Sequence, residues 1–235
     1  MFLQISSFLI VLFSPGIFTS SAEAEEMTTP PVHQSESQTI KLPQPRRDGS
    51  LSLEKVIQNR RSIRDYRQEA IPIADLAQLL WAAQGITDPA GTHRAAPSAG
   101  ALYPLEISVI ARRVTGLPAG VYRYHPRAHS LTRVRSGDVR NDLSRAALEQ
   151  ESVNNAAAVI LISAVYERTF VKYRQRTERY VHMEAGHAAQ NVLLQAVSLG
   201  LGSVPVGAFD DARMKQVAQL SEDEAPLYLL PIGKP

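Results

Sequence analysis

The chain has 235 residues, of which 44% are hydrophobic and 20% are charged, and its formal net charge at pH 7 is +2. This length suits one sizeable domain of ordinary globular composition. Such a small net charge argues against a strong electrostatic field for nucleic acid, and we predict no nucleic-acid partner. The absence of cysteine excludes disulfides, thiolate metal sites and a cysteine nucleophile, and leaves the redox compartment open.

The first 24 residues differ from the rest of the chain. The apolar run "SSFLIVLF" is broken by Pro15 and Gly16, and "AEA" at 22–24 offers a cleavage site of small residues. The run is shorter than the ~20 residues that a membrane span needs, so residues 1–24 predict a secretory signal. We therefore expect export, to the periplasm or the extracellular space, with no stable span in the mature chain. If the signal is not genuine, the protein is cytoplasmic.

Residues 25–47 are polar, rich in proline and without hydrophobic periodicity. Such a segment buries too little apolar surface to offset its ordering entropy, which predicts a linker. The folded domain is expected over residues 48–235.

The first part of this domain reads as two helices followed by irregular chain. The apolar residues Leu53, Val56 and Ile57 have amphipathic helical spacing, and Arg60 begins the next turn. Residues 71–85 predict a second helix, with a proline near its start and a glycine at its end. The Gly/Pro/Ser-rich passage 85–104 breaks regular structure, and a strand is expected from Glu106.

The remaining elements mix strands and helices without a strict βαβ alternation, which indicates one domain of the α+β class. Alternating residues on either side of a turn predict a hairpin over 120–137. A continuous apolar run over 156–166 is typical of a buried central strand. Strands are also expected over 203–209 and 226–233, and helices over 139–150, 180–202 and 211–220.

The segment "NRRSIRDY" places three arginines within five positions, at 60, 61 and 64. Guanidinium forks together with a hydroxyl donor suit a phosphate group, and Arg60, Arg61, Ser62 and Arg64 supply that set. A solvated helix end is the alternative interpretation of the same pattern.

Three other motifs are weaker. "APSAG" around Ser98 is similar to the nucleophile elbow of serine hydrolases, but it lacks the strand before it and the helix after it. His182 and His187 are five residues apart, roughly 140° around a helix, so they diverge and do not form a zinc pair. "GLGSVP" lacks the third glycine of a dinucleotide-binding turn.

Six motifs in order resemble the FMN-dependent nitroreductase superfamily over about residues 50–235. They are "RRSIRDY", "APSAGALYPLE", "GVYRYHP", "KYRQR…EAGHAAQNVLLQAVSLGLG", "GAFDD" and "PLYLLPIGKP". More narrowly, they are similar to its SagB-type branch, which includes the oxidases that convert azolines to azoles in peptide natural products. The resemblance implies a central, mostly antiparallel sheet flanked by helices, and a homodimer with FMN at the subunit interface.

The resemblance also implies roles for particular residues. The arginine–serine segment would hold the FMN phosphate, and a basic residue near the end of the last strand, Lys234, would join it. The "PSAG" turn would run beside the flavin, and a loop of small residues after the long helix would lie over it. The corresponding positions are Pro97, Ser98, Ala99 and Gly100 for the turn, and Ser203, Val204 and Pro205 for the loop.

Lys172 and Tyr173 match a Lys–Tyr dyad that is implicated in proton removal in the azoline oxidases. A lysine serves as a base only where burial or nearby positive charge favours its neutral amine, and Arg174 and Arg176 are nearby cations. A solvent-facing basic stretch is the alternative. No metal ligands are predicted.

Together these features predict an FMN-dependent oxidoreductase that passes hydride between flavin N5 and a small or peptidic substrate. The other half-reaction would use oxygen or a nicotinamide, with NAD(P)H as the electron donor where the substrate is reduced. The alternatives are an NAD(P)H-dependent nitro or quinone reductase, and a flavin-binding module without turnover. The Ala-rich helix after Tyr180 could contact a partner helix or could serve as the core helix of one subunit.

Overall fold

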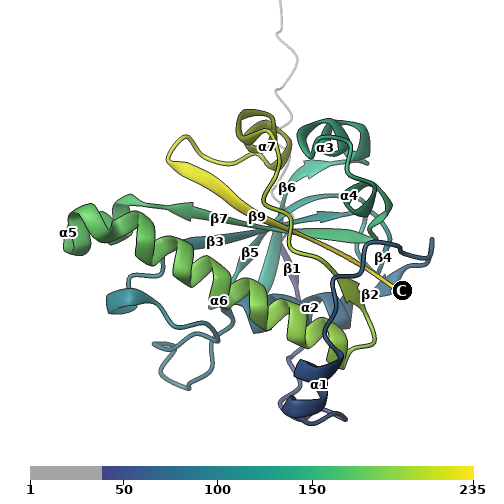
Figure 1. Cartoon of the computed structure of the whole chain (residues 1–235), viewed down its shortest axis with the longest axis horizontal. Coiled ribbons are helices and arrows are strands. Elements are labelled where there is room, and N and C mark those ends of the chain that lie inside the picture. Colours follow the sequence, from purple (N-terminus) through teal and green to yellow (C-terminus); the bar gives the residue numbers. More distant parts are fainter. Residues whose placement is uncertain (1–38) are drawn as a thin grey trace, which may run out of the picture. The chain divides into compact units, whose positions relative to one another are not determined.

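The computed structural model describes residues 39–235 (Figure 1). The expected signal segment and linker residues 25–38 fall outside this range. A seven-stranded sheet has the order β1-β6-β5-β3-β7-β9-β8, and every neighbouring pair in it is antiparallel. Its strands are β1 (Thr39–Lys41), β3 (Leu105–Ala111), β5 (Gly120–His125), β6 (Ser130–Ser136), β7 (Ala158–Val165), β8 (Gly202–Ser203) and β9 (Glu224–Gly233). The predicted α+β class and mostly antiparallel sheet are confirmed.

The other elements are helices and one short parallel pair. The pair joins β2 (Ile71–Pro72) to β4 (Val114–Thr115). The helices are α1 (Leu53–Asn59), α2 (Ile73–Gln84), α3 (Arg140–Ala146), α4 (Glu151–Asn155), α5 (Glu167–Tyr173), α6 (Thr177–Ser198) and α7 (Asp211–Ala218), with single 3-10 turns η1 (Ala99–Ala101) and η2 (Arg174–Arg176). No helix within residues 39–235 is both long and apolar enough to cross a membrane.

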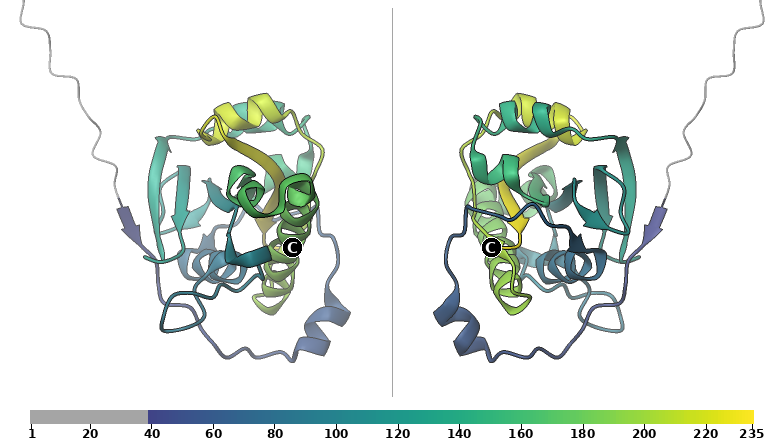
Figure 2. Two further views of the ribbon diagram at one scale, coloured as in Figure 1. Left: turned by 90° about the vertical axis from the view of Figure 1, so that its left-hand side faces the viewer. Right: turned by 90° about the vertical axis from the view of Figure 1, so that its right-hand side faces the viewer.

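Strand β7 is the centre of the fold, because all eight of its residues are buried between β3 and β9. Its side chains alternate between two cores: Ile160 and Ile162 pack with residues of α2 and α6, and Val159 and Leu161 with residues of α3 and α7. Helices therefore cover both faces of the sheet (Figure 2). A strand buried on both faces gives the continuous apolar run seen in the sequence.

Helix α6 packs on the sheet of its own chain. Ala185, Ala188, Ala189 and Ala196 are buried in the same core as α2. The small side chains allow the helix to lie close to the strands. Of the two interpretations of this helix, the described residues support a core helix of one subunit.

The expected linker is wrong for residues 39–47, because these residues pack on the domain. Strand β1 pairs with β6, and Leu42 is buried. The backbone N–H of Arg46 donates to Gln78 Oε1 at 2.7 Å. Ile40 and Leu42 alternate with polar residues, as in a strand at a sheet edge. Proline and polar residues nevertheless dominate the composition of the segment, which is why the sequence predicted a linker there.

Helix α1 differs from an ordinary amphipathic helix in that most of its apolar face is uncovered. Ser52 caps its N-terminus, and Val56 is buried. Leu53 and Ile57 are 61% and 55% exposed. Figure 2 shows α1 standing away from the sheet. The expected strand over 203–209 is also shorter than predicted: β8 ends at Ser203, and beyond Pro205 only Val206 bridges to β9.

Candidate functional site

The first part of the candidate site, which we call the arginine corner, comprises residues 60–67, 202–205 and 231–235. The N–H of Ile63 donates to Ser203 O at 3.0 Å, and the N–H of Arg67 donates to Lys234 O at 2.9 Å. The hydroxyl of Tyr66 lies within hydrogen-bonding distance of two carbonyls, Ile63 O at 2.7 Å and Pro231 O at 3.2 Å. These contacts bring together three segments that are far apart in the sequence.

Two glycines allow this close approach. A Cβ atom added at Gly202 would lie 2.6 Å from Ile63 Cγ2, and one added at Gly233 would lie 2.7 Å from Tyr66 Cβ. Real Cβ atoms do not approach other atoms this closely, so any larger residue would displace the 60–67 segment. The backbone that carries the arginines is therefore held tightly.

Three arginines of this corner have no carboxylate partner within residues 39–235: the ion pairs there include none of Arg60, Arg61 and Arg64, whereas Arg67 pairs with Glu69. Arg61 Nη1 donates only to backbone carbonyls. Arg64 is exposed, as is Ser62, and Arg60 is half-buried at the end of α1. The corner therefore presents unneutralised positive charge.

Lys234, like Arg67, is a member of the corner that pairs with Glu69. Its Nζ lies 2.9 Å from Glu69 Oε2, and this hydrogen bond is the main reason why the pKa of the Glu69 carboxyl lies below its ordinary value. Of the predicted loop, Ser203 and Val204 are buried and Pro205 is exposed. The Ser203 hydroxyl is buried without a hydrogen-bond partner among the described residues.

The second part of the candidate site, which we call the turn site, comprises residues 97–101, Lys172, Tyr173 and Glu184. The hydroxyl of Ser98 accepts a hydrogen bond from the N–H of Tyr103 at 2.9 Å. A Cβ atom built on Gly100 would lie 3.0 Å from both Lys172 Nζ and Tyr173 Oη. The dyad and the turn, both predicted from the sequence, therefore meet at Gly100.

Three of the seven non-glycine residues with positive φ among residues 39–235 lie in or next to the turn site. Beside Gly100, the residues Ala101, Tyr103 and Arg174 have φ values of 55°, 47° and 48°. Non-glycine residues with positive φ are uncommon, and strained residues of this kind cluster at functional sites. The positive φ of Arg174 ends helix α5 directly after the dyad. Tyr103 is further restrained by its own hydroxyl, which donates to Thr92 O at 2.7 Å.

Sequence reasoning did not select Glu184, which lies on α6 and is only 3% exposed. Burial raises the pKa of Glu184 to about 7, and the Ser98 hydroxyl and the charge of Arg94 partly offset that rise. One signal could have revealed it: a carboxylate three residues after Val181 lies on the buried stripe of an amphipathic helix.

The two parts of the site lie at opposite ends of α6. Glu184 beside the turn and Gly200 beside the corner are sixteen residues apart, which corresponds to about 24 Å along a helix. In Figure 1, the loop containing residues 97–101 lies below the start of α6, and the C-terminus lies near the other end of this helix. One copy of the chain therefore does not bring all the predicted residues into one pocket.

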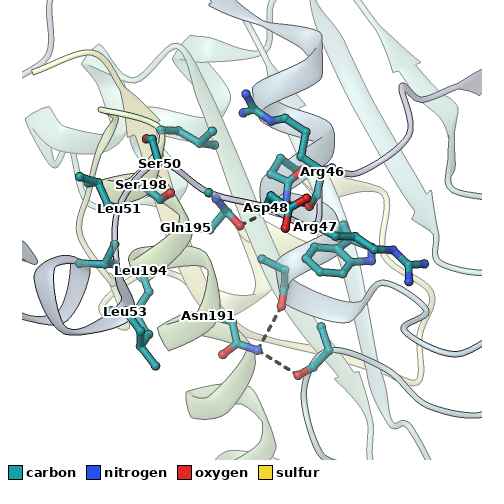
Figure 3. Close-up of a pocket in the computed structure, with 17 residues that line it drawn as sticks. Arg46, Arg47, Asp48, Ser50, Leu51, Leu53, Asn191, Leu194, Gln195 and Ser198 are labelled. Carbon is teal, nitrogen blue, oxygen red and sulfur yellow. Dashed lines mark hydrogen bonds between the residues drawn. The ribbon is translucent and has the colours of Figure 1, made fainter.

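A separate cavity lies away from both half-sites. It has a volume of about 460 Å³ and lies between residues 46–53, α2 and α6 (Figure 3). Trp81, Gln195 and Leu194 are among its lining residues, and it includes none of the predicted site residues. Gln78 Nε2 donates to Gln195 Oε1 at 3.2 Å at its edge. Both predicted half-sites are instead open to solvent in a single chain.

The histidines of "HMEAGH" do not form a metal centre. His182 Nε2 lies 2.7 Å from the Tyr166 hydroxyl, and His187 is exposed. Within the described range of 39–235, no three His, Cys, Asp or Glu residues are grouped to hold a metal ion.

The sheet covered by helices on both faces, with a cationic corner and a strained turn, defines a nitroreductase-like α+β fold. The model of the nitroreductase family matches residues 57–234, and the chain belongs to this family. It is an enzyme, an oxidoreductase of the nitroreductase family.

Two curated relatives illustrate the range of this family. A protein of Methanocaldococcus jannaschii named as a nitroreductase is 46% identical over 184 residues, which cover 78% of this chain and 91% of that protein. The microcin B17-processing protein McbC of Escherichia coli is 27% identical over 165 residues, covering 68% of this chain and 61% of McbC.

Solved structures agree on the fold. A crystal structure named as that of a nitroreductase from Ralstonia eutropha JMP134 has a TM-score of 0.73 and 31% identity, and the match covers 83% of this chain and 89% of that chain. McbC in the Escherichia coli microcin synthetase McbBCD complex gives a TM-score of 0.65 at 22% identity, covering 93% of this chain and 84% of that chain; at this identity the match supports the fold alone.

Proposed function

We propose that this protein is an FMN-dependent oxidoreductase of the SagB type that dehydrogenates a small or peptidic substrate. The observation that carries the proposal is the convergence of Lys172 and Tyr173 on Gly100. Lys172 Nζ and Tyr173 Oη each lie 3.0 Å from the place that a Cβ atom on this glycine would take, at a strained turn. An amine, a phenol and open backbone beside a glycine suit a reaction in which a proton and a hydride leave neighbouring atoms.

The arginine corner fits the phosphate of FMN. The unpaired guanidinium groups of Arg60, Arg61 and Arg64 are donors that suit a phosphate dianion. The corner lies on rigid, closely packed backbone, so little ordering is needed when an anion binds. When bound, a flavin supplies the N5 atom that takes up or returns hydride.

A homodimer would reunite the two half-sites. They are about 24 Å apart along α6 in one chain, so the turn site of one copy would have to meet the arginine corner of another. Exposed apolar side chains occur near both: Leu53 and Ile57 on α1, and Phe170, Val171 and Met183 around the start of α6. Burying these side chains would contribute to such an association.

The role of the dyad follows from its atoms. When a substrate single bond becomes a double bond, a hydride leaves one atom and a proton leaves its neighbour. Lys172 Nζ, in its neutral form, accepts that proton, and the Tyr173 hydroxyl can hold or pass it. The turn holds both groups beside the place where the substrate would lie. Oxygen or a nicotinamide would accept the electrons.

An NAD(P)H-dependent nitro or quinone reductase is the second candidate. It is favoured by the 46% identity to the archaeal protein named as a nitroreductase. A further relative, the NADPH-flavin oxidoreductase of Vibrio harveyi, is 29% identical over 114 residues, 45% of this chain and 48% of that protein. In this reaction the flavin receives hydride from the nicotinamide, and no substrate carbon loses a proton.

The test begins with the visible absorption spectrum of the purified protein and identification of the released chromophore by mass. The flavin is then exposed without oxygen either to NADPH or to azoline-containing peptides. Reduction by the peptides, lost in Lys172→Ala, supports the dehydrogenase. Reduction by NADPH alone, unchanged in Lys172→Ala, supports the reductase. A protein that takes up no flavin would overturn both.

A further inference from the structure

Helix α5 carries the Lys172–Tyr173 dyad but has little apolar packing of its own. Thr169 is the one buried residue of this seven-residue helix, and Phe170 and Val171 are 49% and 66% exposed. Burial of apolar surface therefore contributes little to holding α5 in place. The position of the dyad depends instead on the polar and aromatic contacts that the helix makes.

Arg168 makes two such contacts at the start of the helix. Its Nη1 donates to Tyr103 O at 3.1 Å, and its Nη2 lies 2.6 Å from Glu106 Oε1 on β3. Arg168 and Lys172 are four residues apart, so they are neighbours on one face of α5. This face therefore contacts the chain at Gly100 and again, one helical turn away, at Tyr103.

The carboxylate that pairs with Arg168 is itself held on the sheet. Glu106 Oε2 lies 4.0 Å from Nη1 of Arg123 on β5. Arg123 in turn donates two hydrogen bonds of 2.6 Å to the carboxylate of Glu224 on β9, which is 3% exposed. A bidentate pair of this kind has a defined geometry. Arg168 is thus tied to a charge network that spans three strands.

We propose that Arg168 is a positioning residue that fixes the distance between the Lys172–Tyr173 dyad and the Pro97–Ala101 turn. Its planar guanidinium bonds a carboxylate of the sheet and a carbonyl just after the turn at the same time, so it places α5 relative to both. The other end of α5 is held separately, because the Tyr173 ring packs edge-on against Tyr180 with 4.8 Å between the ring centres.

One consequence of this arrangement, that Lys172 reaches the proton of a substrate, rests on the proposed function. The placement of α5 by Arg168 does not, because the contacts that carry it are present in the chain without substrate or flavin.

The first experiment measures this placement by NMR in protein labelled in lysine and glycine, both flavin-free and with its flavin. The nuclear Overhauser effect between the Lys172 side chain and the Gly100 α-protons reports their separation. The chain has five lysines and thirteen glycines, and loss of signals in Lys172→Arg assigns the pair. The effect is expected in the unmodified protein and should lose most of its intensity in Arg168→Gln.

Two further variants sharpen this measurement. Arg168→Lys keeps the charge but cannot form the two-armed contact, so it should also weaken the effect, though by less. Arg179→Gln removes an arginine from an exposed position of α6 and should retain the full effect.

The second experiment separates positioning from a general structural role by a double-mutant cycle with the azoline-containing peptides. Arg168→Gln should lower kcat on the order of 10- to 100-fold, with a smaller change in KM, because a misplacement of about 1 Å can cost this much. In the Lys172→Ala background the same substitution should cause little further loss, since the group that it positions is gone. Losses that multiply would overturn the proposal.

The proposal would also be overturned by a Lys172–Gly100 effect that is absent from the unmodified protein or unchanged in Arg168→Gln. If Arg168→Gln does not fold, Arg168→Lys decides in its place. A protein that oxidises none of the peptides would overturn the proposed function, whereas the NMR measurement would still decide whether Arg168 places the dyad at the turn.

Discussion

The arginine corner and the turn site hold their candidate functional groups in place by opposite physical means. In the corner, backbone hydrogen bonds and close glycine contacts hold a chain in which no residue has a positive φ, while the guanidinium groups of Arg61 and Arg64 are exposed. At the turn site the backbone is strained, and a carboxyl is buried beneath it. A phosphate brings its own countercharge, so exposed cations suffice to bind it. Control of a single proton instead needs groups close to the reacting atoms, and Lys172 Nζ and Tyr173 Oη each lie 3.0 Å from the place that a Cβ atom on Gly100 would take.

Replacing Lys172 with alanine tests the turn site most strongly. We expect turnover of the dehydrogenation to fall by about 100-fold or more, because a positioned general base contributes on the order of 10²–10⁴ in rate. Flavin content should not change, since the arginine corner is untouched. Steady-state kinetics and the ratio of visible to ultraviolet absorbance measure both quantities. Lys215→Ala on α7 is the control, and equal losses in the two variants would remove Lys172 from the mechanism.

Replacing Glu184 with glutamine tests the buried carboxyl through stability. Its folded-state pKa, about 7, lies above the ordinary value of 4.5. The neutral form therefore contributes stability that is fully present below the ordinary value and is lost as the pH rises through about 7. We expect the free energy of unfolding of the unmodified protein to decline by on the order of 3 kcal/mol over this range. Glu184→Gln should lack that decline.

Urea denaturation at pH 5, 6, 7 and 8 measures this difference. Glu178→Gln provides the control, because this exposed residue lies on the same helix. Parallel curves for the unmodified protein and Glu184→Gln would show that the carboxyl does not titrate in the folded state as its burial indicates.

Replacing Arg60 with alanine tests the arginine corner. Loss of one charge-assisted hydrogen bond to phosphate should weaken FMN binding by about 10- to 100-fold, with little change in the free energy of unfolding. Ser62→Ala should have a smaller effect in the same direction. Isothermal titration of FMN into the flavin-free protein measures both. Arg145→Ala, an exposed arginine on α3, should bind normally, and full FMN affinity in Arg60→Ala would contradict its assignment.

Replacing Glu69 with glutamine should have the smallest effect. It frees Lys234 from its carboxylate partner, 2.9 Å away. We expect FMN affinity to rise about two- to fivefold at low salt, and the gain to disappear at high salt, because exposed ion pairs are weak and screened. Titrations at two salt concentrations measure this change. Weaker binding in Glu69→Gln would mean that Glu69 orients Lys234 rather than competing for it.

Much of the fold was predictable from local pattern. The apolar run of β7, the hairpin of β5 and β6, and the helical spacing of α2 and α6 each follow from side-chain period. The start of the domain was not predictable in this way, because β1 is short and lies among prolines. Its strand character depends on pairing with β6, ninety residues further along the chain.

The sequence by itself determined most of the elements, the motif order that indicates the family, and the candidate residues of both half-sites except Glu184. Only the tertiary structure decided how those residues are grouped. Gly100 meets Lys172 because α5 packs beside the turn, and Glu184 is buried because α6 packs on the sheet. The same helix keeps the arginine corner away from the turn. Periodicity records which face of a helix is apolar, but the partner of each buried polar group depends on contacts between distant segments.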